Sequence, residues 1–477
     1  MKKIYLTITF CLIALVTFSQ KDVTDSQLAS EYYRGKEYDK AAVLYKKLFN
    51  STKSKVYFSY YLKCLIKLED FKTAEKTIKK QQKKHSKDMT YQVELGYLYK
   101  AQGMLDKSVD KYNYAIKKMP ANASKIKQLA SAFSSKQEYE FAELVYLEGR
   151  KKTSDNNFHY ELANIYTIQR DHQKMIDEYL ELIDNDENEL NRVQGRLQYA
   201  VINDVDDVMR NLLKTSLLKR IQGVSKKTVY TELLIWLYIQ GKNFKEALFQ
   251  VKALDRRNNE NGKRLINLGG LAASNKSYEV ALEAYQYVID KGESCPNYVT
   301  AKLEFLNVLY KKVISGELTT QQEISTLEQN YLNTILEFGK NSTTIGLIKD
   351  LAHLQAFYLD KTDDAIELLE GAIAIPGMPH KLLSACRLEL GDVYLLIDEV
   401  WEATLIYAKV EKNNKHNPTG HEAKFRKAKL AYYTGNFKWA QAQLDVLKSS
   451  TSKLIANDAL ELALLINNNT ALDTSTV

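Results

Sequence analysis

The chain has 477 residues, of which 45% are hydrophobic and 26% charged, with a net charge of +8, 5 prolines, 19 glycines and 4 cysteines. This composition excludes collagen-like, disulfide-scaffold and low-complexity chains, and its hydrophobic fraction is too high for a disordered protein. The small number of prolines favours uninterrupted helices, because proline removes a backbone donor and clashes within a helix.

Residues 1–20 have the pattern of a secretory signal peptide: two lysines, an apolar run from Ile4 to Phe18, and then the small residue Ser19. This run has about 15 residues, fewer than the roughly 20 that cross a bilayer as a helix. We therefore expect cleavage near Ser19 or Gln20, with a retained membrane anchor as the alternative. No later apolar run is long enough to span, so the sequence predicts an exported bacterial protein of the periplasm or cell envelope without a transmembrane segment after cleavage.

The cysteines do not form a recognisable framework. Removing Cys11 with the signal peptide leaves Cys64, Cys295 and Cys386, widely spaced and without a CxxC motif. We expect them to be small buried apolar residues, with Cys295, which precedes a proline, as the most exposed of the three.

A helical hairpin is most readily seen in residues 91–120. Gly96 and Ser108 are small, as a close crossing of two antiparallel helices requires, and Tyr99 and Tyr112 have the size to fill the space around it. Gly103 is expected to end the first helix by adopting a positive φ.

The small crossing residue recurs along the chain at steps of 33 or 34 residues in the N-terminal part, where Met175 is a looser match. The predicted anchors of the repeat, including Gly96, are Ala41, Ala74, Gly96, Ser108, Ala142, Ala247, Ala281, Ala365, Ala403 and Ala440.

This pattern resembles the tetratricopeptide repeat (TPR) family from about residue 26 to residue 449. The resemblance implies an all-α fold: a right-handed superhelical solenoid of about twelve antiparallel helical hairpins, each burying one face on the next.

The expected organisation follows from the spacing of the repeats. One long interval between successive crossing residues marks a divergent repeat, and a second long interval marks an insertion. The apolar helix expected at 454–466 is followed by a polar tail. We expect either a chain that continues further or a partner that covers that helix. The predicted parts are a signal peptide at 1–20, an N-terminal TPR array at 21–189, a divergent repeat at 190–227, a C-terminal array at 228–449 with an insertion near 311–342, and an incomplete repeat with a tail at 450–477.

Motifs of catalysis are missing from the sequence: there is no phosphate-binding glycine loop, no nucleophile elbow and no His-Glu-x-x-His pair. Two nearby histidines, His416 and His421, would need further ligands to hold a metal. We therefore expect a non-enzymatic protein without a cofactor or metal.

Charge is distributed unevenly along the chain. Residues 21–88 contain 17 Lys/Arg against 9 Asp/Glu, whereas residues 177–207 contain 10 acids against two arginines. Both segments can be read as solvated helix faces. The alternative is a groove whose basic end attracts an acidic segment of a partner protein.

In the TPR family, partner peptides lie against the first helices of consecutive repeats. The resemblance therefore implies partner binding at Lys63, Lys67, Tyr97, Lys100, Lys127 and Asn164. The Lys–Asn pair with which some TPR domains hold a terminal carboxylate is broken here, because Ser131 follows Lys127 at the matching position and Tyr160 precedes Asn164.

The predicted function is a protein–protein interaction scaffold or adaptor of the cell envelope. The alternative is a structural, self-associating envelope component. Nucleic acid is not an expected partner, because the repeats carry no recurring polar code at fixed positions.

Overall fold

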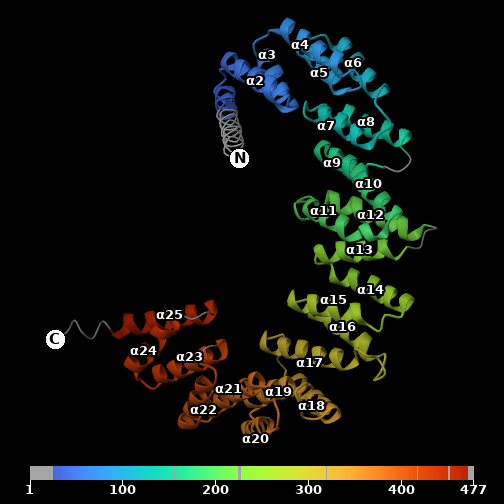
Figure 1. Ribbon diagram of the computed structural model, residues 1–477. Coiled ribbons are helices and arrows are strands. Elements are labelled where there is room, and N and C mark those ends of the chain that lie inside the picture. The colour runs from blue at the N-terminus through green and yellow to red at the C-terminus, as the bar shows by residue number, and fades with distance from the viewer. Residues whose placement is uncertain are drawn as a thin grey trace, which may run out of the picture. The chain divides into compact units, whose positions relative to one another are not determined.

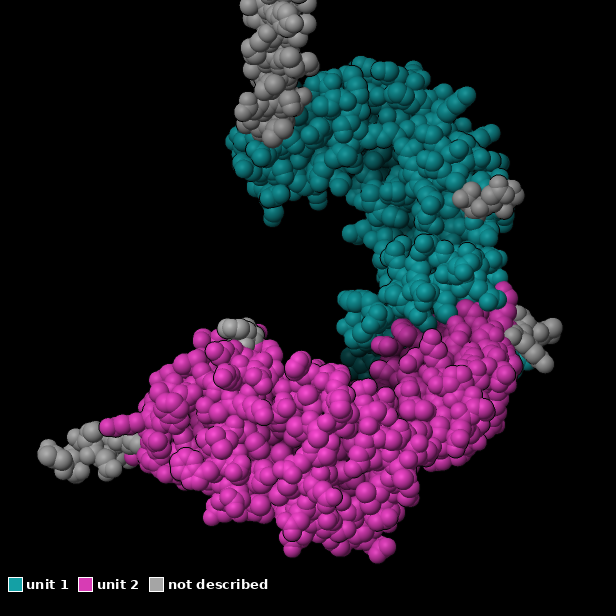
Figure 2. Space-filling view, turned by 60° about the horizontal axis from the view of Figure 1, so that its bottom comes forward, with its two compact units in different colours: residues 1–224 teal, residues 225–477 magenta. Residues whose placement is uncertain are grey.

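The computed structural model describes residues 25–153, 157–223, 227–317, 320–415, 417–449 and 452–470. The predicted signal peptide at 1–20, His416 and the end of the polar tail lie outside these residues. The chain divides into two compact units, residues 1–224 and 225–477, which are coloured separately in Figure 2. Across the described residues the regular structure is helical, with no strand, so the predicted all-α class is confirmed.

Unit 1 begins with helical residues 25–34. Its other helices, drawn from blue to green in Figure 1, are α2 (Tyr38–Thr52), α3 (Lys55–Lys67), α4 (Phe71–Lys84), α5 (Thr90–Ala101), α6 (Leu105–Lys117), α7 (Ala123–Ser134), α8 (Tyr139–Lys152), α9 (His159–Gln169), α10 (His172–Asn185), the 3-10 helix η1 (Glu187–Glu189), α11 (Leu190–Ile202) and α12 (Val208–Gln222).

Unit 2 consists of α13 (Thr228–Gln240), α14 (Phe244–Asn258), α15 (Lys263–Ser274), α16 (Tyr278–Ile289), α17 (Tyr298–Ile314), α18 (Gln321–Phe338), α19 (Ile345–Tyr358), α20 (Thr362–Ile373), α21 (His380–Leu396), α22 (Val400–Asn413), α23 (Pro418–Tyr433), α24 (Phe437–Leu447) and α25 (Lys453–Thr470).

Successive helices pack in pairs. Residues 25–34 pair with α2, α3 pairs with α4, and the series continues to α23 with α24, which makes twelve hairpins in the described chain. The predicted number of hairpins, about twelve, is therefore confirmed. The predicted divergent repeat falls on α11 and α12, and the predicted insertion falls on the long helices α17 and α18.

In three of the hairpins the crossing depends on a glycine that faces a tyrosine sixteen positions later. A Cβ added to Gly96 would lie 2.4 Å from the Tyr112 ring, and one added to Gly391 would lie 2.5 Å from the Tyr407 ring. Gly269 meets Tyr285 in the same way, at 2.7 Å. No side chain fits in these gaps, so the two helices approach closely only because the first one carries glycine there.

All ten predicted anchors lie in the protein core. Apart from Gly96 and Ser108, each of them is an alanine with no exposed surface. Ser108 is 2% exposed, and Met175, the looser match, is also 2% exposed.

The turn inside ten of the hairpins contains a residue of positive φ, always five positions before the crossing residue. Gly103 has φ 77°, as predicted, and Gly435 has the same value. The other eight have side chains: Lys36, Glu69, Gln137, Arg170, Lys242, Lys276, Asp360 and Asp398. The turn is therefore defined by its conformation rather than by glycine.

The buried tyrosines predict an alkaline limit to stability. Burial raises the pKa of Tyr45, Tyr146 and Tyr285 to about 12, from the ordinary value of 10.0. Folding therefore favours the neutral phenol, so their contribution is present below pH 10 and is lost as the pH rises from 10 towards 12. We expect phenolate absorbance of these rings to appear together with loss of helical circular dichroism. Complete tyrosine ionisation near pH 10 in a folded chain would contradict this.

The three cysteines in the described residues are buried, as expected. Cys64, Cys295 and Cys386 are free and buried. Cys295 is the most exposed of the three, as expected, but at 8% it is still buried, and its Sγ donates a hydrogen bond to the Asn261 carbonyl at 3.3 Å. The turn that contains Cys295 packs against the connection of the preceding hairpin.

The last described helix, α25, packs against α23 and α24. Ile455, Ala459, Ala463 and Ile466 form the buried side of this contact. The opposite sides carry the exposed leucines Leu454, Leu460, Leu464 and Leu465. None of the described helices combines the length and apolar character needed to cross a membrane.

Candidate partner-binding surface

Helix α4 is the most lysine-rich element of unit 1. Asp70 caps its first turn by accepting a hydrogen bond from the Thr73 amide at 3.1 Å, and only Ala74 and Ile78 are buried. Lysines recur every four residues at 72, 76, 80 and 84 and therefore share one stripe of the helix. Each like-charged pair at this spacing costs a helix about 0.2–0.5 kcal/mol. This local cost is not compensated by carboxylates on the same stripe.

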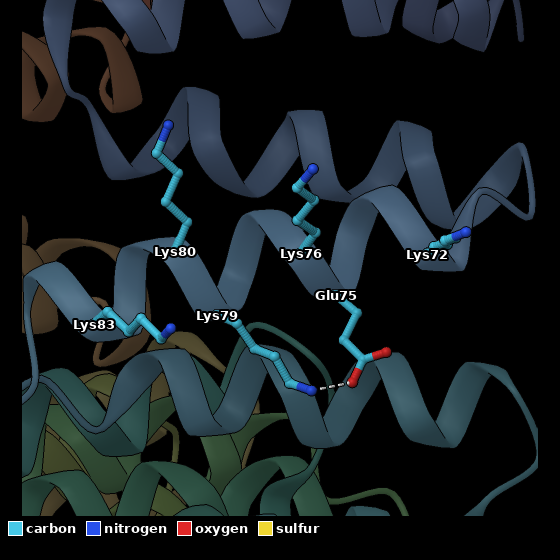
Figure 3. Close-up of a pocket in the computed structure, with 6 residues that line it drawn as sticks. All are labelled: Lys72, Glu75, Lys76, Lys79, Lys80 and Lys83. Atoms are coloured by element: carbon cyan, nitrogen blue, oxygen red, sulfur yellow. Dashed lines mark ion pairs between the residues drawn. The ribbon is translucent and has the colours of Figure 1, made fainter.

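A hollow of about 580 Å³ lies along α4 and is lined by Lys72, Glu75, Lys76, Lys79, Lys80 and Lys83. Figure 3 shows Lys76 and Lys80 on one side of the helix and Glu75 and Lys79 on the other. Glu75 is the one carboxylate among these six residues and pairs with Lys79 at 2.6 Å. The hydrogen bond from Lys79, together with one from Tyr99, holds the pKa of Glu75 below its ordinary value.

A second hollow of about 410 Å³ adjoins the first at Lys80 and is formed by the ends of α2 and α4 and the starts of α3 and α5. Its lysines are Lys53, Lys55, Lys80 and Lys84. The carboxylate in its wall, Asp88, is paired with Lys55. Burial would raise the pKa of Asp88, but hydrogen bonds from Lys55 and Thr90 outweigh it and hold that pKa below its ordinary value.

A third hollow, of about 390 Å³, shares Lys84, His85 and Asp88 with the second and adds Lys87 and Lys125. We call the three hollows together the α4 basic surface. Ten different lysines line it, against the two carboxylates Glu75 and Asp88, each of which already has a lysine partner. Eight lysines are therefore left without an ion pair in the described residues: Lys53, Lys72, Lys76, Lys80, Lys83, Lys84, Lys87 and Lys125. Such a surface attracts a polyanionic partner.

The predicted partner-binding residues lie on the first helices of the hairpins, α3, α5, α7 and α9, whereas α4 is a second helix. Lys67 is exposed at the end of α3. Lys63 is half-buried, with its Nζ 5.1 Å from the centre of the Tyr60 ring. Burial lowers the pKa of Lys63 and the nearby Lys136 lowers it further, while Glu94 opposes the shift.

Two of the other predicted lysines are already engaged within the array. Lys100 pairs with Glu138 at 2.7 Å, and Lys127 pairs with Glu161 at 2.5 Å. Both bonds join one hairpin to the next. A partner carboxylate would have to compete with them, so these lysines act first as connections between repeats.

The remaining two predicted residues differ in their surroundings. Tyr97 is half-buried beneath Lys136, whose Nζ lies 4.8 Å from the ring centre. Asn164 is exposed on α9. The structure thus brings Lys63 and Tyr97 close to the same buried ammonium group, that of Lys136, whereas in the described residues no hydrogen bond or ion pair joins Asn164 to the other five.

Sequence reasoning missed Lys136, the buried lysine that Lys63 and Tyr97 approach. The Lys136 side chain is 2% exposed and pairs with Glu94 at 2.8 Å. Nothing in the sequence distinguishes Lys136 from other turn lysines. The Lys127–Glu161 pair, in contrast, spans 34 residues, one repeat, so opposite charges one repeat apart were a signal that could have revealed it.

The acidic segment 177–207 is also partly engaged. Glu178 is 9% exposed, binds Arg150, and lies 2.8 Å from His159 Nδ1. Burial raises the pKa of Glu178, but hydrogen bonds from His159 and Arg150 outweigh this and leave the pKa lowered. Glu181 pairs with Arg220 at 3.3 Å. This segment is therefore less available to a basic partner than its composition suggests.

The described residues contain no group of three or more His, Cys, Asp and Glu side chains arranged to hold a metal ion. The α4 basic surface is an array of positively charged hydrogen-bond donors, which suits carboxylates or other anions.

Comparison with known proteins gave structural neighbours only. No protein-family model matches the sequence, and no curated protein matches it significantly. The solved structures that are similar in fold include yeast Tom70, at 12% identity and a TM-score of 0.36, covering 95% of this chain and 97% of that one. Naa15/Naa10 bound to HypK-THB is similar at 16% identity and a TM-score of 0.33, covering 94% of this chain and 67% of that one.

A third similar structure is a putative kinesin light chain with nearly identical TPR-like repeats from Podospora anserina, at 16% identity and a TM-score of 0.31, covering 44% of this chain and 95% of that one. Because these TM-scores are low, the fold is assigned from the packing of the hairpins and not from these similarities. With a glycine facing a tyrosine at three of its helix crossings and buried alanines at others, the described chain folds as an all-α array of TPR-like hairpins.

Proposed function

We propose that the protein is a non-enzymatic interaction scaffold of the bacterial cell envelope and that its unit 1 binds an acidic segment of a partner protein. The observation that carries this proposal is the α4 basic surface, with eight lysines that have no ion pair. The export pattern at residues 1–20 supports the envelope location. The acidic segment would lie along α4 rather than only against the first helices, because several first-helix lysines are already paired.

Reversing two charges on the α4 stripe tests this. The double variant Lys76→Glu with Lys84→Glu leaves Lys72 and Lys80 in place, so charges alternate along the stripe and the like-charge repulsion is relieved. We expect a fluorescent ten-residue polyglutamate peptide to bind wild-type protein and to bind this variant about tenfold more weakly, or worse, a loss of about 1.4 kcal/mol. Binding should also weaken as salt is raised, because these charges are exposed.

The matched comparison is Lys63→Glu with Lys67→Glu, which reverses the same number of charges on a first helix. A smaller loss in this variant, with helix content unchanged in both, assigns the acidic segment to the α4 surface. Equal binding of the peptide by wild type and the α4 variant would exclude that surface. Association of the protein only with itself in sedimentation experiments would favour a structural envelope component instead.

A further inference from the structure

Helix α4 is held by fewer buried side chains than any other helix from α2 to α12. Only Ala74 and Ile78 are buried on α4, whereas the second helices before and after it, α2 and α6, bury five and four side chains. Most of the stability of a helix in a protein comes from the packing of its apolar face. Helix α4 therefore resists local opening less than its neighbours do.

The least supported part of α4 is its second half, residues 79–84. None of these residues is buried: the lysines are exposed, and the two glutamines are half-buried. The helix ends at Lys84 without the left-handed residue that terminates many helices, since the φ of His85 is −129°. Neither a buried side chain nor a left-handed cap holds this half closed.

The lysines of α4 repel each other within the helix. Side chains four residues apart are neighbours on a helix surface. Four pairs of lysines have this spacing: Lys72–Lys76, Lys76–Lys80, Lys79–Lys83 and Lys80–Lys84. The helix dipole favours lysines in the last turn, and Glu75 attracts Lys79, but the repulsive pairs outnumber this attractive one. Opening of the helix separates the ammonium groups, so the charge of α4 favours the open state.

Opening of α4 would also dismantle part of the α4 basic surface. Lys80, Gln81 and Lys84 belong to the wall of the second hollow, and Lys79 and Lys83 line the first. Only the closed helix holds its lysines in regular stripes. An anion that binds these stripes therefore shifts the equilibrium towards the closed helix.

We propose that residues 79–84 are a charge-controlled switch, which opens locally while the lysines of α4 are not neutralised and closes when an anion neutralises them. That an acidic segment of a partner protein supplies the negative charge rests on the proposed function. Binding of the partner and closing of the helix are then coupled. The apparent affinity is reduced in proportion to the fraction of molecules in which the helix is open.

Hydrogen exchange followed by mass spectrometry, corrected for the intrinsic rate of each sequence, tests the switch in the wild-type chain. At low salt, residues 79–84 should exchange at least about tenfold faster than the central turns of α6 and α8. Raising NaCl from about 10 mM to about 1 M shortens the Debye length from about 30 Å to about 3 Å, so the repulsion is screened and exchange should slow. The same change should weaken binding of the polyglutamate peptide, so salt acts on the helix and on binding in opposite directions.

The peptide itself should close the helix. With polyglutamate at about ten times its dissociation constant, exchange of residues 79–84 should slow about tenfold, because the closed helix alone binds. Exchange within unit 2 serves as the internal reference and should not change.

The variant Lys76→Gln with Lys80→Gln removes three of the four repulsive pairs and introduces a residue that also forms helices well. Without peptide, exchange of residues 79–84 should be about three- to tenfold slower than in wild type, although the variant binds the peptide more weakly. The matched control, Lys409→Gln with Lys412→Gln, removes two exposed lysines from α22 in unit 2. This control should leave exchange of residues 79–84 at the wild-type rate.

The outcomes separate the switch from the proposed function. Exchange of residues 79–84 as slow as that of α6 and α8 at low salt would overturn the switch. Peptide binding that leaves this exchange unchanged would also overturn it, and the proposed function would stand. A helix that is closed by salt and by Lys76→Gln with Lys80→Gln, in a protein that does not bind the peptide, would support the switch and exclude the acidic segment.

Discussion

Ala142→Arg is expected to open the hairpin of α7 and α8 and to destabilise its neighbours. Ala142 has no exposed surface and lies at the crossing of the two helices. An arginine there would either bury an unpaired charge or force the helices apart, at a cost of about 3–5 kcal/mol. Whole domains are stable by only about 5–15 kcal/mol, and a repeat array opens locally because each repeat contacts only its neighbours.

Hydrogen exchange followed by mass spectrometry locates the effect. Amides of α7 and α8 should exchange fastest, those of α5, α6, α9 and α10 should follow, and unit 2 should keep its wild-type protection. The control is Leu144→Arg, which introduces the same side chain two residues away at a position that is 43% exposed. If Ala142→Arg unfolded at the wild-type temperature, the assignment of the crossing residue would be wrong.

Asp255→Ala is expected to have the second large effect, in unit 2. Asp255 has no exposed surface, accepts a hydrogen bond from the Gly262 amide at 2.7 Å, and pairs with Lys291 at 2.6 Å. The Tyr287 hydroxyl also donates a hydrogen bond, at 3.2 Å, to Oδ2, the same oxygen that pairs with Lys291. Alanine would leave several donors without their acceptor, which predicts a loss of about 3–5 kcal/mol.

Urea unfolding and hydrogen exchange over α14 to α16 measure this loss. Asp255→Asn keeps an acceptor for the Gly262 amide but removes the charge that faces Lys291, so its loss should be intermediate. Asp290→Ala removes an exposed aspartate beside Lys291 and should change little. Equal stability of Asp255→Ala and Asp290→Ala would show that the buried network does not stabilise the join between these hairpins.

The fold was predictable because its determinants are local and periodic. Gly96 and Tyr112 are sixteen residues apart within one hairpin, and the same spacing recurs at Gly391 and Tyr407, so the sequence displays each crossing directly. The hydrogen bond from Cys295 to the Asn261 carbonyl could not be predicted, because it depends on the connection of the preceding hairpin, a contact that no repeat spacing reveals.

The candidate site was less predictable than the fold. The excess of lysine and arginine over acidic residues in the segment 21–88 could be counted from the sequence. Which of these lysines remain unpaired, however, depends on side-chain partners in neighbouring hairpins. Lys100 and Lys127 have such partners, whereas Lys76 and Lys84 do not. The resemblance to the TPR family predicted partner binding at the first helices, whereas the structure places the largest group of unpaired lysines on a second helix, α4.

The turns of positive φ have a consequence for how this architecture changes over time. Eight of the ten turns accept a side chain in a conformation that costs about 1 kcal/mol relative to glycine, so what persists from hairpin to hairpin is a backbone shape and a fixed distance to the crossing residue. Lys, Glu, Gln, Arg and Asp all occupy that turn position. An array built in this way can exchange almost every residue of its repeat while keeping its geometry. Sequence similarity between related arrays is then lost long before the similarity of their backbones.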